Sequence, residues 1–253
     1  MQAQRFPARQ GWVWLSQGFA LWRKAPMALT GACLTMTMLL LIAAVVPGLG
    51  QFLPALLLPP LGVGVFRLCS EIRRTGSGAP VVLFSGFRLH LSRQMVIGAA
   101  RLVSQLACVI LAARIAGIDP TESLGKLSAD GSTLMLSPRL EAFVGWGMAL
   151  GLPLELLFWF TPQLVALGGI SPVKAVFFNI VSCWRNIAPL VVSMLLWALL
   201  FAFLPALLIN VVSAASPALG SLLLAPLFLI MMPVFYATFH ASACDIFGEV
   251  LAQ

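Results

Sequence analysis

Six apolar runs of about twenty residues each limit what this chain can fold into. They occupy residues 27–47, 52–72, 95–117, 142–168, 188–211 and 217–239. A helix of about 20 residues crosses the roughly 30 Å of bilayer hydrocarbon. In that medium only helices and closed barrels satisfy their backbone hydrogen bonds internally. The pattern therefore predicts an all-α, polytopic membrane protein with six transmembrane helices.

The composition indicates one membrane domain. Hydrophobic residues make up 60% of the 253 residues and charged residues 9%, whereas soluble domains are about 25% charged. Six spans use most of this length, so we expect a single membrane domain over residues 1–253. The net charge of +7 could point to nucleic acid, but the basic residues flank apolar runs, where they meet anionic lipid. We predict that the partners are membrane lipids, anionic ones in particular. A protein partner in the membrane is a further possibility, and we expect no binding to nucleic acid.

The connections group the spans into three hairpins. Short uncharged breaks follow the first span, at 47–50, and the fifth span, around 213–217, whereas a polar segment at about 118–140 joins the third and fourth spans. Lys and Arg near span ends resist translocation and so report orientation. Two, Lys126 and Arg139, lie on the side of the 118–140 loop; ten lie on the N-terminal side, namely Arg5, Arg9, Arg23, Lys24, Arg73, Arg74, Arg88, Arg93, Lys174 and Arg185. We expect both termini in the cytoplasm of a bacterial inner membrane, with the loop outside.

An aromatic and basic pair recurs ahead of the hairpins. FALWRKAP at 19–26 and CWRNIAP at 183–189 share a Trp-Arg pair, and a weaker copy carries Phe-Arg at 87–88. Around each pair, at about 9–24, 173–187 and, more weakly, 81–94, polar residues gather on one side of a helical projection and aromatic or aliphatic residues on the other, as in helices that lie in the membrane interface. The polar side of the 173–187 segment includes Asn179, Ser182 and Asn186. The chain is therefore predicted to consist of three units, about 8–72, 80–169 and 171–247, each an amphipathic interfacial helix followed by a hairpin.

Seven residues of these surface helices are predicted to contact lipid headgroups. An aromatic ring favours the headgroup level, and a cation next to it reaches lipid phosphate. The alternative is that Trp and Arg stand there only because bacterial membrane proteins generally place them at the inner interface. The seven are Trp22, Arg23, Lys24, Phe87, Arg88, Trp184 and Arg185.

Arg101 and Glu155 lie inside predicted spans. Arg101 is six residues into the third span, and Glu155 is near the middle of the fourth, in GLPLELLFWFTP. A contact between them needs a vertical adjustment of about one helical turn, roughly 5 Å. Ionisable residues in a membrane are paired with one another or mark a solute path. We predict an intramembrane charge pair that joins the two helices of one hairpin; a polar path for a proton or solute is the alternative.

Enzymatic signatures are missing from the sequence. His90 and His240 are its two histidines, its five cysteines are widely spaced, and it has no HExxH, GxSxG or phosphate-binding Gly-Lys motif. We expect no catalytic residue, cofactor or metal site, and a non-enzymatic role in organising lipid or a membrane complex. The alternative is a small-solute transporter or channel that uses Glu155 and Arg101.

Several stretches resemble a family of uncharacterised multi-pass inner-membrane proteins of proteobacteria. They are PARQGWVWLSQGFALWRKAPMALTG, VLFSGFR, LLFWFTPQLVALGGISPVKAVFFNIVSCWRNIAP and the terminal DIF. The resemblance implies a multi-pass membrane fold and carries no established activity. That family has Tyr and Arg before the Asp of the last motif, where this chain has Ala243 and Cys244 before Asp245. The layout is also similar to membrane domains that precede glycerophosphodiester phosphodiesterases, although no such catalytic domain is recognisable in the sequence.

Overall fold

The structure, a computed structural model, describes residues 4–50, 52–118, 125–127, 134–215, 224–248 and 251. Within these ranges, six helices are long and apolar enough to cross a membrane. This confirms the prediction of an all-α, polytopic membrane protein.

The spans follow the predicted apolar runs. The first three are α2 (Pro26–Ala44), α3 (Leu53–Thr75) and α4 (Leu91–Ala116). The fourth is α5 (Pro138–Phe158), continued by α6 (Thr161–Ala166). The fifth consists of α8 (Ile187–Ala198), the π-helical turn η2 (Leu199–Phe203) and α9 (Leu204–Ala215), and the sixth is α11 (Leu224–Phe247).

The sixth span ends later than predicted. α11 continues to Phe247, eight residues beyond the predicted end at 239, and residues 217–223 lie outside the described part. His240 and Asp245 end the apolar run, but other side chains bind both. Ser70 Oγ lies 2.9 Å from His240 Nε2, and Trp14 Nε1 donates to Asp245 Oδ2 at 2.8 Å. The predicted end was wrong because polar groups that are satisfied within the protein lengthen a helix beyond its apolar run.

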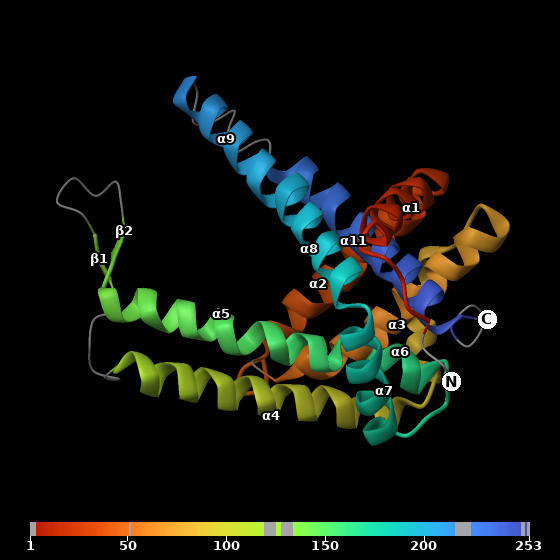
Figure 1. Cartoon of the computed structure of the whole chain (residues 1–253), viewed down its shortest axis with the longest axis horizontal. Coiled ribbons are helices and arrows are strands. Elements are labelled where there is room, and N and C mark those ends of the chain that lie inside the picture. Colours follow the sequence, from red (N-terminus) through yellow and green to blue (C-terminus); the bar gives the residue numbers. More distant parts are fainter. Residues whose placement is uncertain are drawn as a thin grey trace.

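The first surface helix packs against other helices as well as facing outward. α1 (Gln10–Lys24) contacts both α8 and α11 (Figure 1). Gly18 permits the approach to α11, because a Cβ there would lie 2.6 Å from the backbone nitrogen of Thr238. Trp14 is fully buried, whereas Trp12 is 57% exposed. The aromatic side of α1, which we expected to face lipid, is therefore divided between protein and surroundings.

The weaker third copy of the surface helix has a different structure. The segment predicted at 81–94 forms the 3-10 helix η1 (Pro80–Arg88), and His90, with a φ of 46°, separates it from α4. η1 packs on α3 backbone to backbone: a Cβ on Gly86 would lie 1.9 Å from the carbonyl oxygen of Pro60. The prediction of an amphipathic α-helix here was wrong. The spacing of polar and apolar residues along the sequence contains no information about this close packing against α3.

The helix packing links the three predicted units. α2 lies beside α3, and α4 beside α5 (Figure 1). The turn of the third hairpin falls partly outside the described residues. The 118–140 segment contains a short antiparallel pair of strands, β1 (Gly125–Leu127) and β2 (Leu134–Leu136). Because α1 of the first unit packs on α8 and α11 of the last, the units are not independent of one another.

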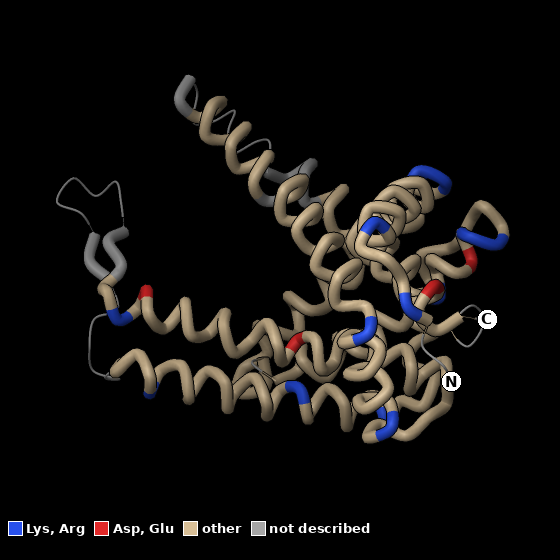
Figure 2. The backbone as a smooth tube through the Cα atoms, in the orientation of Figure 1, with Lys and Arg blue, Asp and Glu red and all other residues tan. Residues whose placement is uncertain are grey.

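Charge is distributed unevenly along the molecule. Most Lys and Arg lie toward the end that holds both termini, and few lie toward the far ends of α4 and α5 (Figure 2). This arrangement agrees with the count made from the sequence. The cytoplasmic placement of the termini stays a prediction that rests on the positive-inside rule.

Candidate functional site

The fold brings Arg101 and Glu155 into contact. α4 begins at Leu91, four residues before the predicted span, which supplies the helical turn of adjustment that the pairing required. An Arg101 guanidinium nitrogen forms an ion pair with Glu155 Oε2, and Gln105 Nε2 donates to Glu155 Oε1 at 2.9 Å. Arg101 is ten residues from the start of α4, which is about 15 Å along the helix axis. The pair therefore lies deep within the span, at about half the thickness of the hydrocarbon.

The fourth span is interrupted just after Glu155. α5 ends at Phe158 and α6 begins at Thr161. Pro162 accounts for the break, because proline cannot donate the hydrogen bond that would close the turn to residue 158 and its ring clashes with the preceding turn. An interruption inside a membrane leaves backbone groups that must find partners in the protein.

Asn179 supplies those partners. It lies on α7 (Pro172–Arg185) and is fully buried. Its Oδ1 accepts from the Phe160 N–H at 2.9 Å, and its Nδ2 donates to the Leu156 and Leu157 carbonyl oxygens, each at 2.7 Å. One side chain thus satisfies three backbone groups at the break.

Cys183 lies one helical turn after Asn179 and contacts the same break in the fourth span. Its Sγ lies 3.9 Å from the Leu156 carbonyl oxygen and 3.6 Å from Asn179 Oδ1. Burial raises the pKa of the Cys183 thiol to about 12. The thiol stays protonated at neutral pH and acts as a weak donor, not as a nucleophile.

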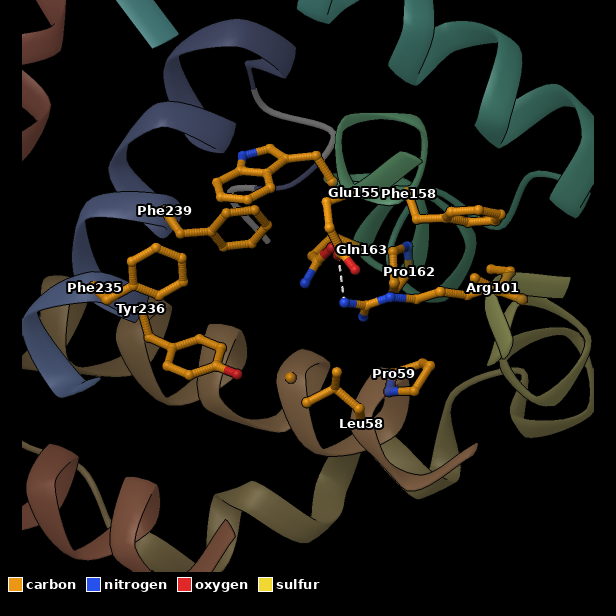
Figure 3. Close-up of a pocket in the computed structure, with 13 residues that line it drawn as sticks. Leu58, Pro59, Arg101, Glu155, Phe158, Pro162, Gln163, Phe235, Tyr236 and Phe239 are labelled. Atoms are coloured by element: carbon orange, nitrogen blue, oxygen red, sulfur yellow. Dashed lines mark hydrogen bonds and ion pairs between the residues drawn. The ribbon is translucent and has the colours of Figure 1, made fainter. Parts of the chain in front are cut away.

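A cavity of about 250 Å³ opens beside the ion pair (Figure 3). Its walls come from α3, α4, the broken fourth span and α11. Most of the lining is apolar: Leu58, Pro59, Gly62, Ile97, Phe158, Trp159, Pro162, Phe235 and Phe239. The polar lining residues are Arg101, Glu155, Gln163 and Tyr236. Figure 3 shows the Tyr236 hydroxyl directed from α11 toward the space in front of the pair.

Three polar atoms of the lining residues have no partner among the residues that the structure describes. They are Arg101 Nε, Trp159 Nε1 and Gln163 Oε1, and all three are buried. Buried polar groups are hydrogen-bonded in the great majority of proteins, so each unpaired one points to a bound water or ligand. Arg101 Nε and Trp159 Nε1 each offer a donor, and Gln163 Oε1 offers an acceptor. The site can therefore bind a group that both accepts and donates a hydrogen bond, with an apolar body against the aromatic walls.

The seven predicted headgroup residues lie away from this cavity. Five of them are exposed: Arg23, Lys24, Arg88, Trp184 and Arg185. Trp22 and Phe87 are half-buried; Trp22 Nε1 donates to Thr30 Oγ1 at 3.1 Å, and Phe87 packs against a buried cluster. Trp184 is 80% exposed, and its contact with lipid stays a prediction.

Sequence reasoning missed Asn179, Gln163 and Tyr236. The helical projection of residues 173–187 predicts Asn179, Ser182 and Asn186 on a polar side that faces outward. All three are buried, and the apolar residues Phe177 and Trp184 are exposed instead. The side that α7 turns to the protein is thus partly its polar side. Pro162, inside a long apolar run, was the signal that a capping partner would be needed nearby.

Comparisons with known proteins support the membrane assignment. The chain is 31% identical over 257 aligned residues to a probable inner membrane protein of Burkholderia thailandensis, covering 98% of this chain and 94% of the relative. No protein-family model matches, and neither does any solved structure. The likeness to the membrane domains of glycerophosphodiester phosphodiesterases finds no support in these comparisons.

Proposed function

Since the chain belongs to the same family as this probable inner membrane protein of Burkholderia thailandensis, we propose that it is a non-enzymatic inner-membrane protein that binds a small amphiphilic lipid beside Arg101 and Glu155. The observation that carries the proposal is the apolar cavity with a buried donor, Arg101 Nε, and a buried acceptor, Gln163 Oε1, that have no partner among the described residues.

The charges of the site select for a neutral polar group. Glu155 already compensates the charge of Arg101, so an ionised ligand would bring an uncompensated charge deep into the span, which is costly. A hydroxyl or an amide can accept from Arg101 Nε and donate to Gln163 Oε1. The aromatic rings of Phe158, Phe235 and Phe239 then cover its apolar part. The volume of about 250 Å³ suits a small molecule or one end of a longer one, since ligand cavities usually measure about 300–1,000 Å³.

Filling the cavity should displace the bound molecule. Gly62 lines the cavity, and a Cβ added there meets no atom within 4 Å. We expect Gly62→Leu to lower the amount of co-purified amphiphile about tenfold, measured by mass spectrometry of molecules extracted from protein purified in mild detergent. Gly145→Leu is the matched control, because Gly145 is also open to a Cβ but does not line the cavity.

Two results would contradict this function. One is a parent protein that carries no small molecule after gentle purification. The other is Gly62→Leu protein that carries as much as Gly145→Leu. Thermal unfolding of both variants shows whether each remains folded. Gln163→Met, which removes the unpaired acceptor and keeps the length of the side chain, checks the polar contact separately.

Exposed surface cations support a second contact with lipid. Arg88 and Arg185 are exposed and make no hydrogen bond or ion pair with the described residues, and the Arg23 guanidinium lies 5.3 Å from the Phe19 ring centroid. Replacing the three arginines with Gln should weaken binding of the purified protein to anionic liposomes and leave binding to zwitterionic ones unchanged. Equal binding of parent and variant to anionic liposomes would refute this contact.

The break after Glu155 favours small-solute transport as a second candidate. Interrupted helices next to buried charges build the substrate sites of many transporters. Flux of a proton or solute into proteoliposomes, lost in Glu155→Gln, would establish transport. Absence of flux together with a retained amphiphile would leave lipid binding as the function.

A further inference from the structure

A second cavity, of about 310 Å³, lies between α1, α3 and α11. It is close to the ends of all three helices: Lys24 is the last residue of α1, and Arg73 lies in the last turn of α3. Its polar lining residues are Gln17, Lys24, Arg73, His240 and Asp245. α1 leads directly into the first span, so this cavity lies at the membrane interface, where headgroups are found.

Lys24 and Arg73 offer uncommitted positive charge to this cavity. Both are exposed, and neither forms a hydrogen bond or ion pair with the described residues. His240 adds no free cation, because it is buried and its Nε2 lies 2.9 Å from Ser70 Oγ. The two cations come from different helices and line one cavity, which suits a single phosphate group.

Asp245 adds a carboxylate to the same cavity. Gln10 Nε2 and Trp14 Nε1 both donate to its Oδ2 at 2.8 Å, which fixes the carboxyl group in place. Its Oδ1 accepts no hydrogen bond from the described residues and is not buried. A purely anionic ligand would be repelled by this carboxylate, whereas a ligand with an ammonium group would be attracted by it.

We propose that this cavity binds the headgroup of a phospholipid that carries a primary amine, as in phosphatidylethanolamine. The phosphate diester contacts Lys24 and Arg73, and the ammonium group donates to Asp245 Oδ1. A primary ammonium has three hydrogen-bond donors, whereas the quaternary ammonium of phosphatidylcholine has none. This site is separate from the Arg101–Glu155 cavity and does not rest on the function proposed for it.

The test counts lipids that remain on the protein in native mass spectrometry after exchange into a single phospholipid with fixed acyl chains. We expect the parent to retain phosphatidylethanolamine about tenfold better than phosphatidylcholine or phosphatidylglycerol. Arg73→Gln should lower phosphatidylethanolamine retention about tenfold. Arg74→Gln, a change at the next, exposed residue of α3 that does not line the cavity, should not.

The carboxylate has its own variant. Asp245→Asn keeps an oxygen for Gln10 and Trp14 but removes the charge, so it should abolish the preference for ethanolamine over choline. If that variant does not fold, the double variant Lys24→Gln with Arg73→Gln replaces it in the test and should lose phosphatidylethanolamine retention. Equal retention by Arg73→Gln and Arg74→Gln, or equal retention of ethanolamine and choline lipids by the parent, overturns the proposal. Release of the lipid by inorganic phosphate alone identifies the ligand as free phosphate and also overturns it.

Discussion

Replacing Asn179 with alanine is expected to lower the free energy of unfolding by about 3 kcal/mol or more. The substitution removes three hydrogen bonds at the break in the fourth span. It leaves the Phe160 N–H without a partner, whereas the Leu157 carbonyl group keeps Thr161 Oγ1 and the Leu156 carbonyl group keeps the Trp159 N–H. A buried polar group that loses its partner costs about 1–3 kcal/mol, and each of the two other lost hydrogen bonds costs about 0.5–1.5 kcal/mol. Thermal or denaturant unfolding in detergent measures the loss.

Asn210 provides the matched control for this experiment. Its Nδ2 donates to the Ala206 carbonyl oxygen at 2.7 Å, but this residue is exposed and its helix is continuous there. Asn210→Ala should change stability by no more than about 0.5 kcal/mol, as is usual for exposed positions. Similar losses in the two variants would mean that Asn179 does not hold the break.

The second large effect concerns the intramembrane ion pair. Glu155→Leu alone leaves Arg101 unpaired within the span. Scales of membrane insertion assign such a cation about 2.5–3.5 kcal/mol at a central position. The long Arg101 side chain can extend toward the membrane interface once Glu155 is replaced, so we expect a smaller loss, about 1–2 kcal/mol. The double replacement Glu155→Leu with Arg101→Leu should recover most of it.

A double-mutant cycle separates the pair from the individual residues. The coupling is the departure of the double variant from the sum of the single ones, measured by unfolding in detergent. Arg114 and Glu141, near the far ends of the same helices, are exposed and form no ion pair with each other. A cycle on these two residues should give a coupling near zero. Additive losses at Arg101 and Glu155 would show that the two charges do not stabilise one another.

The sequence was sufficient to predict the spans and the contact between Arg101 and Glu155, but not most of the other contacts between helices. Hydropathy depends on each residue's own chemistry, and bilayer thickness converts it to a helix length, so the six spans could be predicted. Opposite charges at similar depth in neighbouring spans also pointed to Arg101 and Glu155. The end of α11 was missed because Asp245 is satisfied by Trp14, more than two hundred residues away.

The cavity and the residues that hold its walls could not be predicted from the sequence. They depend on contacts between distant segments, which the periodicity of one helix does not reveal. A helical projection of residues 173–187 separates polar from apolar side chains, but it does not say which side meets protein. Asn179 binds backbone groups at the break in the fourth span, so the polar side of α7 faces the protein interior. Tyr236 and Gln163 line the cavity from two different helices, and neither stands out within its own apolar run.

The position of α1 has a consequence for how the protein is made. The ribosome synthesises residues 10–24 first, yet the helices that cover Trp14 and Gly18 include α11, which it synthesises last. Hydrogen bonds from Gln10 and Trp14 to Asp245, and from the Gln4 N–H to the Ile246 carbonyl oxygen, can form only after the sixth span has entered the membrane. We therefore expect α1 to dock last, after the later spans have been inserted.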